Sequence, residues 1–90
     1  MFVHIYVVRL PGEEKHPEFA DIPNGGAKDF WLIEAPQVEK EVDGMWYFRP
    51  SDFKAWRDAV WKEVVTNTEI YIAALDAVER DPTLWFRAST

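Results

Sequence analysis

The stretch from Trp46 to Ile70 constrains this chain more than any other, because it runs an aromatic segment into an amphipathic helical pattern. Residues three or four positions apart lie on one face of a helix. On that spacing a bulky apolar stripe is formed by Phe53, Trp56, Val60 and Val64, with Trp61 and Val65 about 100° further round. We therefore expect this helix to supply much of the core, and we expect Trp31, Trp56 and Trp61 to be buried in it.

Length and composition limit the class of protein. Ninety residues predict one domain over residues 1–90. The chain has no cysteine, which excludes disulfides and thiolate metal sites and is consistent with a reducing cytoplasm. Its net charge of −6 disfavours direct binding to nucleic acid, which needs clustered Lys and Arg, and favours solubility or a basic protein partner.

The N-terminal segment is apolar but carries no sign of export. It lacks the basic start and the small-residue cleavage site of a secretory signal. No apolar run in the chain approaches the roughly 20 residues that span a bilayer. These features predict a cytoplasmic protein with no membrane association.

The first half of the chain has the pattern of strands separated by turns. Phe2–Leu10 is apolar on both alternating faces, which predicts a central strand that ends at Pro11-Gly12. The charged segment 13–28 contains two prolines and a Gly-Gly pair, which predict a long loop. Consecutive apolar residues in Asp29–Ala35 predict a second strand, interrupted by Pro36.

A hairpin is predicted around Asp43-Gly44, a dipeptide that favours the type I′ turn. Val38–Val42 alternates apolar and charged residues, as an edge strand does, and Met45–Arg49 is the returning strand. Placing Val42 opposite Met45 sets the register. That register puts Glu41 opposite Trp46 and Lys40 opposite Tyr47.

The helical region is expected to begin at Ser51, a good N-cap, with Asp52 at the positive end of the helix dipole. Its apolar stripe continues through Tyr71, Leu75 and Val78, so residues 51–79 form either one long helix or two shorter ones that break at Asn67. Thirty residues of helix would span about 45 Å, more than a core of this size requires, which favours the break.

The chain ends in a segment that returns to the core. Asp81-Pro82 ends the helical region, and Thr83–Phe86 is expected to pack back as a short turn or strand. Together these patterns predict the α+β class, with an antiparallel sheet of three to four strands packed on one long or two shorter C-terminal helices.

The sequence contains no assembled catalytic motif. Its glycines do not form a phosphate-binding loop, and neither His4 nor His16 is paired with a Ser or Cys nucleophile. His16 and the neighbouring carboxylates of Glu13, Glu14 and Glu18 could in principle hold a metal ion, but charged loops of this kind are usually only solvated. We therefore assign no catalytic residue, no metal ligand and no cofactor, and we favour a protein that is not an enzyme.

The segment Phe53–Ile70 resembles the helix that precedes the HNH motif in colicin and pyocin DNases, with the pattern F-x-x-[FW]-R-x-x-[FVL]-W-x-E-V. The resemblance covers about a fifth of the chain. That family continues with a D-P-x-L element, whereas this chain reads Thr68-Glu69-Ile70 there and has Asp81-Pro82-Thr83-Leu84 only later. The paired histidines that hold the metal in that family are absent. The resemblance therefore implies a nuclease-related domain without its catalytic motif.

The acidic charge and the many aromatic residues favour a noncatalytic protein-binding module, such as a bacterial or phage inhibitor, an immunity-type factor or an adaptor. The alternatives are a nuclease-related domain and a DNA-mimic inhibitor. The expected partner is a protein, either basic or nucleic-acid-binding. We expect it to contact acidic and aromatic residues on and near the hairpin, which are Glu39, Glu41, Trp46, Tyr47 and Trp85. The aromatic residues that could be partly exposed there are Trp46, Tyr47, Trp85 or Phe86.

Overall fold

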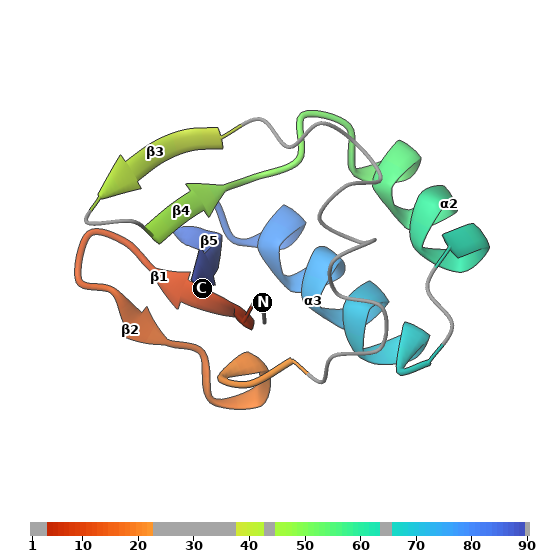
Figure 1. The fold of residues 1–90 in the computed structure, drawn as a ribbon, viewed down its shortest axis with the longest axis horizontal. Coiled ribbons are helices and arrows are strands. Elements are labelled where there is room, and N and C mark those ends of the chain that lie inside the picture. Colours follow the sequence, from red (N-terminus) through yellow and green to blue (C-terminus); the bar gives the residue numbers. More distant parts are fainter. Residues whose placement is uncertain (1–3, 23–37, 43–44, 64–65, 90) are drawn as a thin grey trace.

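The computed structural model describes residues 4–22, 38–42, 45–63 and 66–89 (Figure 1). The elements in chain order are strand β1 (His4–Arg9), strand β2 (Glu14–Lys15), the 3-10 helix η1 (Pro17–Phe19), strands β3 (Val38–Val42) and β4 (Met45–Phe48), helices α2 (Phe53–Glu63) and α3 (Thr68–Arg80), and strand β5 (Leu84–Ser89).

The strands form one antiparallel sheet in the order β2-β1-β5-β4-β3. The C-terminal strand β5 lies at its centre, since all six of its residues pair with β1 and three of them also pair with β4. Helices α2 and α3 lie on one side of the sheet (Figure 1). The predicted α+β class is confirmed, with four strands of four to six residues and a fifth, β2, of two residues.

Strand β1 has the two apolar faces that the sequence predicts for a central strand. Ile5 and Val7 belong to the core that the helices cover. Tyr6 and Val8 are buried in a second cluster on the opposite face of the sheet. β2 and β5 pair with β1 on its two sides, so the prediction of a central strand is confirmed.

The predicted hairpin register is also confirmed. Val42 pairs with Met45, Glu41 with Trp46, and Lys40 with Tyr47. β3 is at the edge of the sheet, as its alternating charged pattern predicts. An irregularity between Val38 and Lys40 shifts the register there, and bulges of this kind are frequent on edge strands because they hinder further pairing.

The helical region divides into two helices, as the weak helix formers after residue 65 favour. Asn67 adopts the left-handed conformation, with a φ of 59°, directly before α3. Asn tolerates this conformation better than most residues, so it provides the break. The N-cap of α2 differs from the prediction: the Asp52 carboxylate, not the Ser51 hydroxyl, accepts a 3.1 Å hydrogen bond from the Ala55 amide.

Two further predictions need correction. The segment predicted as a short turn or strand over Thr83–Phe86 is a strand, but it is the longer β5 (Leu84–Ser89), with Leu84, Phe86 and Ala88 buried on the helix side. The segment 13–28 is not a loop throughout, because its described part contains β2 and η1. The predicted strand Asp29–Ala35 and the turn Asp43-Gly44 lie outside the described residues.

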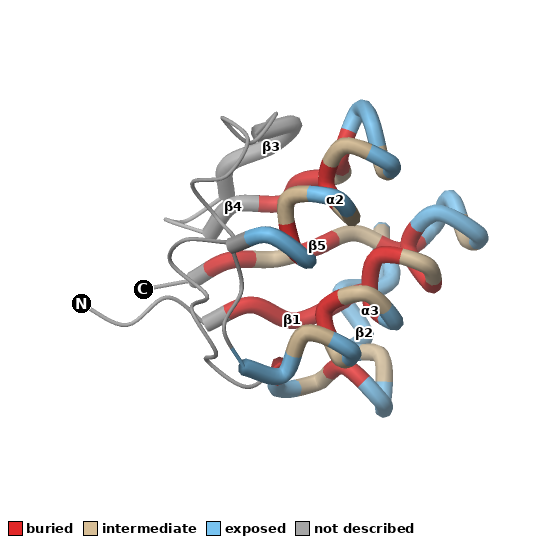
Figure 2. Tube along the Cα trace, turned by 90° about the vertical axis from the view of Figure 1, so that its right-hand side faces the viewer, coloured by how far each residue is buried: buried red, intermediate tan, exposed pale blue. Residues whose placement is uncertain are grey.

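The main core lies between the sheet and the two helices. In both helices, buried stretches alternate with exposed ones along the chain (Figure 2). Buried stretches also run through β1 and β5. The helices contribute a row of fully enclosed side chains, as their apolar spacing predicts: Trp56, Val60, Tyr71, Ala74, Leu75 and Val78. The ring of Trp56 lies against that of Phe48, with 5.8 Å between centroids.

The two tryptophans of α2 have opposite environments. Trp56 is 2% exposed, which confirms its predicted place in the core. Trp61 is 60% exposed, so the prediction that it is buried is wrong. The reason is angular: Trp61 follows Trp56 by five residues, about 140° round the helix, and the inward stripe is already filled by Trp56 and Val60.

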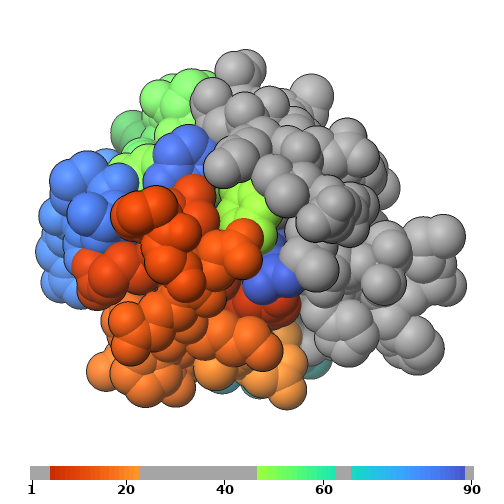
Figure 3. Space-filling model, turned by 90° about the vertical axis from the view of Figure 1, so that its left-hand side faces the viewer, coloured from red at the N-terminus to blue at the C-terminus, as the bar shows by residue number. Residues whose placement is uncertain are grey.

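The opposite face of the sheet carries a smaller cluster, made of Tyr6, Val8 and Tyr47. The Arg87 guanidinium lies over the rings of Tyr6 and Tyr47, at 5.1 Å and 5.7 Å from their centroids. Figure 3 shows this side, where the segment from β1 to η1 forms most of the coloured surface. The cluster therefore combines apolar packing with cation–π contacts.

The turn between α3 and β5 is organised by the carboxylate of Asp81. It accepts hydrogen bonds from the Thr83 amide (3.0 Å), the Thr83 hydroxyl (2.7 Å) and the Arg9 guanidinium (2.8 Å). These hydrogen bonds lower the pKa of Asp81 from its ordinary 3.8 to about 2, with the largest contribution from the Thr83 hydroxyl, the next from Arg9 and a smaller one from the Thr83 amide. Asp81 thereby connects the start of β5 to the end of β1.

Replacing the two tryptophans of α2 separately should give very different losses of stability. We expect Trp56→Ala to cost about 3–5 kcal/mol, because it removes a large buried side chain. The matched variant Trp61→Ala should cost less than about 1 kcal/mol, because its ring is mostly exposed. Urea unfolding followed by circular dichroism measures both values, and equal losses would contradict the assignment of these side chains.

The ionised form of Asp81 should stabilise the fold in a defined pH range. Its pKa is lower in the folded state, so this stabilisation is present above about pH 4 and disappears as the pH falls towards 2. We expect Asp81→Asn to be less stable than wild type at pH 7, with a difference that shrinks between pH 4 and pH 2. Thermal unfolding of both proteins across this range measures the difference, and one that stays constant with pH would contradict the role of Asp81.

Candidate functional site

The predicted binding residues on the hairpin have different environments. Tyr47 is 2% exposed, so the expectation that its ring lies at the surface is wrong. Its hydroxyl donates a hydrogen bond to the Glu13 carboxylate, and its ring lies in the cluster with Tyr6 and Val8. The reason is that β4 lies between β5 and β3 in the sheet. Phe48 belongs to the core on the helix side of the sheet, and Tyr47 belongs to the cluster on the opposite face.

The other predicted contact residues remain predictions. Trp85 is half-buried and packs against the cluster of Tyr6, Val8 and Tyr47. Phe86, one of the four alternatives for a partly exposed aromatic residue, is fully buried. The structure places the backbones of Glu39, Glu41 and Trp46 in β3 and β4, whereas their side chains lie outside what it describes.

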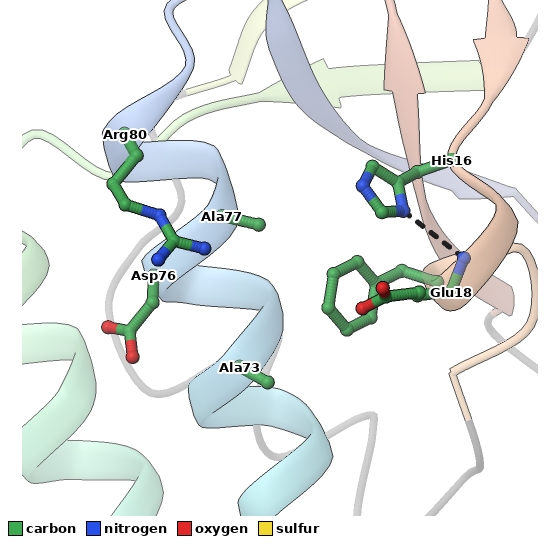
Figure 4. A pocket seen from close by; sticks show the side chains of 7 residues that line it. His16, Glu18, Ala73, Asp76, Ala77 and Arg80 are labelled. Carbon is green, nitrogen blue, oxygen red and sulfur yellow. Dashed lines mark hydrogen bonds between the residues drawn. The ribbon is translucent and has the colours of Figure 1, made fainter.

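A cleft of about 270 Å³ lies between η1 and α3 and includes the one histidine whose side chain is described, His16. Small residues of α3 leave room for it, since Ala73 and Ala77 point from the helix towards His16 (Figure 4). The imidazole Nδ1 of His16 accepts a 3.2 Å hydrogen bond from the Glu18 amide and caps η1. The ring also packs on Phe19, 4.9 Å between centroids.

The side chains around this cleft are engaged in structural contacts. Asp76 is turned away from His16 (Figure 4) and accepts a 2.8 Å hydrogen bond from Arg57 on α2. A second hollow of about 290 Å³ lies on the other side of His16, where Arg9 is bound to Asp81. Within the described part of the chain, no group of three or more His, Asp or Glu side chains is arranged to hold a metal ion. Neither hollow pairs His16 with a carboxylate that could orient it.

The surface around Trp61 has the features of a contact site. Trp61 is the single large hydrophobic residue exposed among those described. Its neighbours on the exposed side of α2 are charged, and we call the five residues together the Trp61 surface: Lys54, Arg57, Asp58, Trp61 and Lys62. The residues predicted from the sequence as contact residues do not include this surface, although the 140° offset between the two tryptophans is a signal for it.

Arg57 is held in place beside this tryptophan by α3. Its Nε donates a 2.8 Å hydrogen bond to Asp76, and a terminal nitrogen donates a second one to Glu79. Hydrogen bonds to Glu79 and Asp76 raise the pKa of Arg57 above its ordinary value. Because both partners belong to α3, the guanidinium is fixed one helical turn from Trp61 in the free protein.

Two of the remaining charges of the Trp61 surface, Lys54 and Asp58, form a pair along the helix. The Lys54 ammonium lies 2.8 Å from the Asp58 carboxylate one turn later. This hydrogen bond to Asp58 raises the pKa of Lys54. An exposed pair of this kind contributes little to stability, so its main effect is to place an ammonium and a carboxylate about 20° and 60° round the helix from Trp61, on the side opposite to Arg57.

Comparisons with known proteins identify no relative. No protein-family description, curated protein or solved structure matches this chain. The resemblance of Phe53–Ile70 to the helix of the colicin and pyocin DNases therefore stays a prediction; the segment spans α2, the break at Asn67 and the start of α3. None of the helices that the structure describes is long and apolar enough to cross a membrane.

Proposed function

We propose that this protein is a noncatalytic protein-binding module and that the Trp61 surface is one of its contact sites. The observation that carries the proposal is the 60% exposure of Trp61 beside a guanidinium fixed by two carboxylates. Trp and Arg are the residue types most enriched at the energetic centres of protein interfaces. The Trp61 surface presents both within one turn of helix.

The arrangement also lowers the cost of binding. Long charged side chains normally lose rotamer freedom when an interface forms. Here Arg57 is already ordered by Asp76 and Glu79 in the free protein. A partner that covers Trp61 would therefore gain apolar contact without ordering Arg57 again.

The acidic hairpin is the second contact site in this proposal. It lies at the far end of the molecule from α2 (Figure 1), so both surfaces can be occupied at once. The net charge of −6 would favour a basic partner there, with Glu39 and Glu41 on the edge strand. An inhibitor, immunity-type factor or adaptor of bacterial or phage origin is the role that such a module would fill.

Site-specific photo-crosslinking in cells that produce the protein tests this proposal. Replacing Trp61 with p-benzoylphenylalanine keeps an aromatic side chain at the exposed position. Illumination should yield a covalent adduct with a protein, and Arg57→Ala in the same chain should reduce its yield several-fold, because the fixed guanidinium is lost.

The matched control carries the same crosslinker at Glu14, an exposed residue of β2 at the other end of the molecule. Adduct formation at position 61 and not at position 14 supports the proposal. If position 61 gives no adduct, or both positions capture the same proteins equally, the Trp61 surface is not a contact site.

A further inference from the structure

We propose that the occupant of the Trp61 surface is a second copy of this chain, bound through an antiparallel pair of α2 helices. This inference rests on the proposed function and names the partner of that contact site. It is supported by three properties of α2: the angular positions of its exposed residues, the contacts that they would make across a two-fold axis, and the balance of their charges.

The exposed residues form a continuous stripe on the side of α2 away from the core. At 100° per residue, Lys54, Arg57 and Asp58 lie within about 60° of Trp61, whereas Trp56 lies about 140° away. Lys54, Asp58 and Trp61 follow one another at intervals of four and three residues, which is the spacing of a helix–helix contact seam. α2 also forms one edge of the molecule (Figure 1), so a second helix can approach it.

A two-fold axis between Arg57 and Asp58 pairs these residues favourably. In that antiparallel register Arg57 lies opposite Asp58 of the second copy, and Lys54 lies opposite Trp61 of the second copy. The first contact joins opposite charges, and the second places an ammonium by the face of an indole ring. Symmetry produces each contact twice, as in any two-fold interface.

Arg57 has the hydrogen-bonding capacity for this contact. A guanidinium has five N–H donors. In the described residues, one of these goes to Asp76 and one to Glu79. The remaining N–H groups can bind Asp58 of the second copy while α3 keeps the guanidinium in position.

The charges around Trp61 balance locally, so this surface repels a second copy less than the charge of the whole chain would. The chain as a whole carries −6, so two copies repel at long range. The three bases Lys54, Arg57 and Lys62 are balanced locally by three acids, Asp58, Asp76 and Glu79. Counted together with Asp76 and Glu79 of α3, the Trp61 surface is therefore neutral, and the rest of the chain carries the net charge of −6.

The small area of the contact sets the strength of the dimer. One seam of about two helical turns buries less than the roughly 800 Å² per partner of a standard interface. We therefore expect a weak, reversible dimer, with a dissociation constant on the order of 100 µM. Such a dimer would present two acidic hairpins to a basic partner and so strengthen their binding through avidity.

Sedimentation equilibrium of the purified full chain, from about 10 µM to about 1 mM, tests the inference. The average mass should rise from 10.5 kDa towards twice that value. Trp61→Ala should stay at 10.5 kDa across the range. The double variant Lys54→Asp/Asp58→Lys keeps an ion pair along the helix but opposes Arg57 with a lysine, and it should weaken the dimer at least tenfold.

The double variant leaves the net charge at −6, so a weaker dimer cannot be attributed to a change in net charge. The control variant Glu14→Lys lies on β2 and makes the chain less negative, so it should dimerise at least as strongly as wild type. Circular dichroism verifies that every variant is folded. In wild type, amide chemical shifts that change with concentration should be confined to α2 and the facing residues of α3.

A wild-type mass that stays at 10.5 kDa up to 1 mM overturns the inference, as does a dimer that forms equally well in Trp61→Ala. A crosslinked adduct at position 61 with a different protein, together with a monomeric purified chain, overturns the inference and leaves the proposed function standing. An adduct of two copies of this chain supports both.

Discussion

The antiparallel pairing of β1 with β5 is the interaction on which the rest of the structure depends. It joins all six residues of the first strand to all six residues of the last, and β5 then carries β4 on its other side. Two segments separated by most of the chain must therefore meet before the sheet exists, and closing so long a loop has an entropic cost. Burial of both faces of β1 offsets this cost, because each face belongs to its own apolar cluster.

This pairing also determines which side of each helix is available to a partner. With β1, β5 and β4 side by side, the helix-facing row of Val7, Phe86 and Phe48 is wide enough to receive one stripe from each helix. Trp56 and Val60 occupy the core-facing stripe of α2, so the second tryptophan of this helix, Trp61, has no place in the core. The exposure of Trp61 thus follows from the way in which the sheet is built. Trp61 therefore lies on the outer face of α2, where Arg57, Lys54 and Asp58 are already held in ion pairs.

The local features of the fold were predictable from the sequence. Alternation of charged and apolar residues around Asp43-Gly44 gave the correct pairing of Glu41 with Trp46, because a two-residue turn leaves one register. The two apolar faces of β1 and the break at Asn67 were readable for similar local reasons.

The errors arose where a residue's role depends on distant parts of the chain. Nothing local shows that Leu84–Ser89 lies between β1 and β4, so the segment was underestimated as a short turn or strand. The burial of Tyr47 follows from the same arrangement, since its contacts are Tyr6, Arg87 and Glu13. The candidate site was missed for a related reason: a tryptophan in an amphipathic helix is usually core, and the 140° offset from Trp56 excludes Trp61 only if the sheet face is already filled by Trp56 and Val60.

Amide hydrogen exchange measured by NMR tests the central role of the β1–β5 pairing most directly. If the whole fold depends on this contact, the amides that bond across β1 and β5 exchange only when the protein unfolds globally, so they are the slowest in the chain and share one opening free energy. The result that would contradict the account is fast exchange in β5 while β1 and the helices stay protected. In that case the C-terminal strand would open on its own, and the sheet would not depend on it.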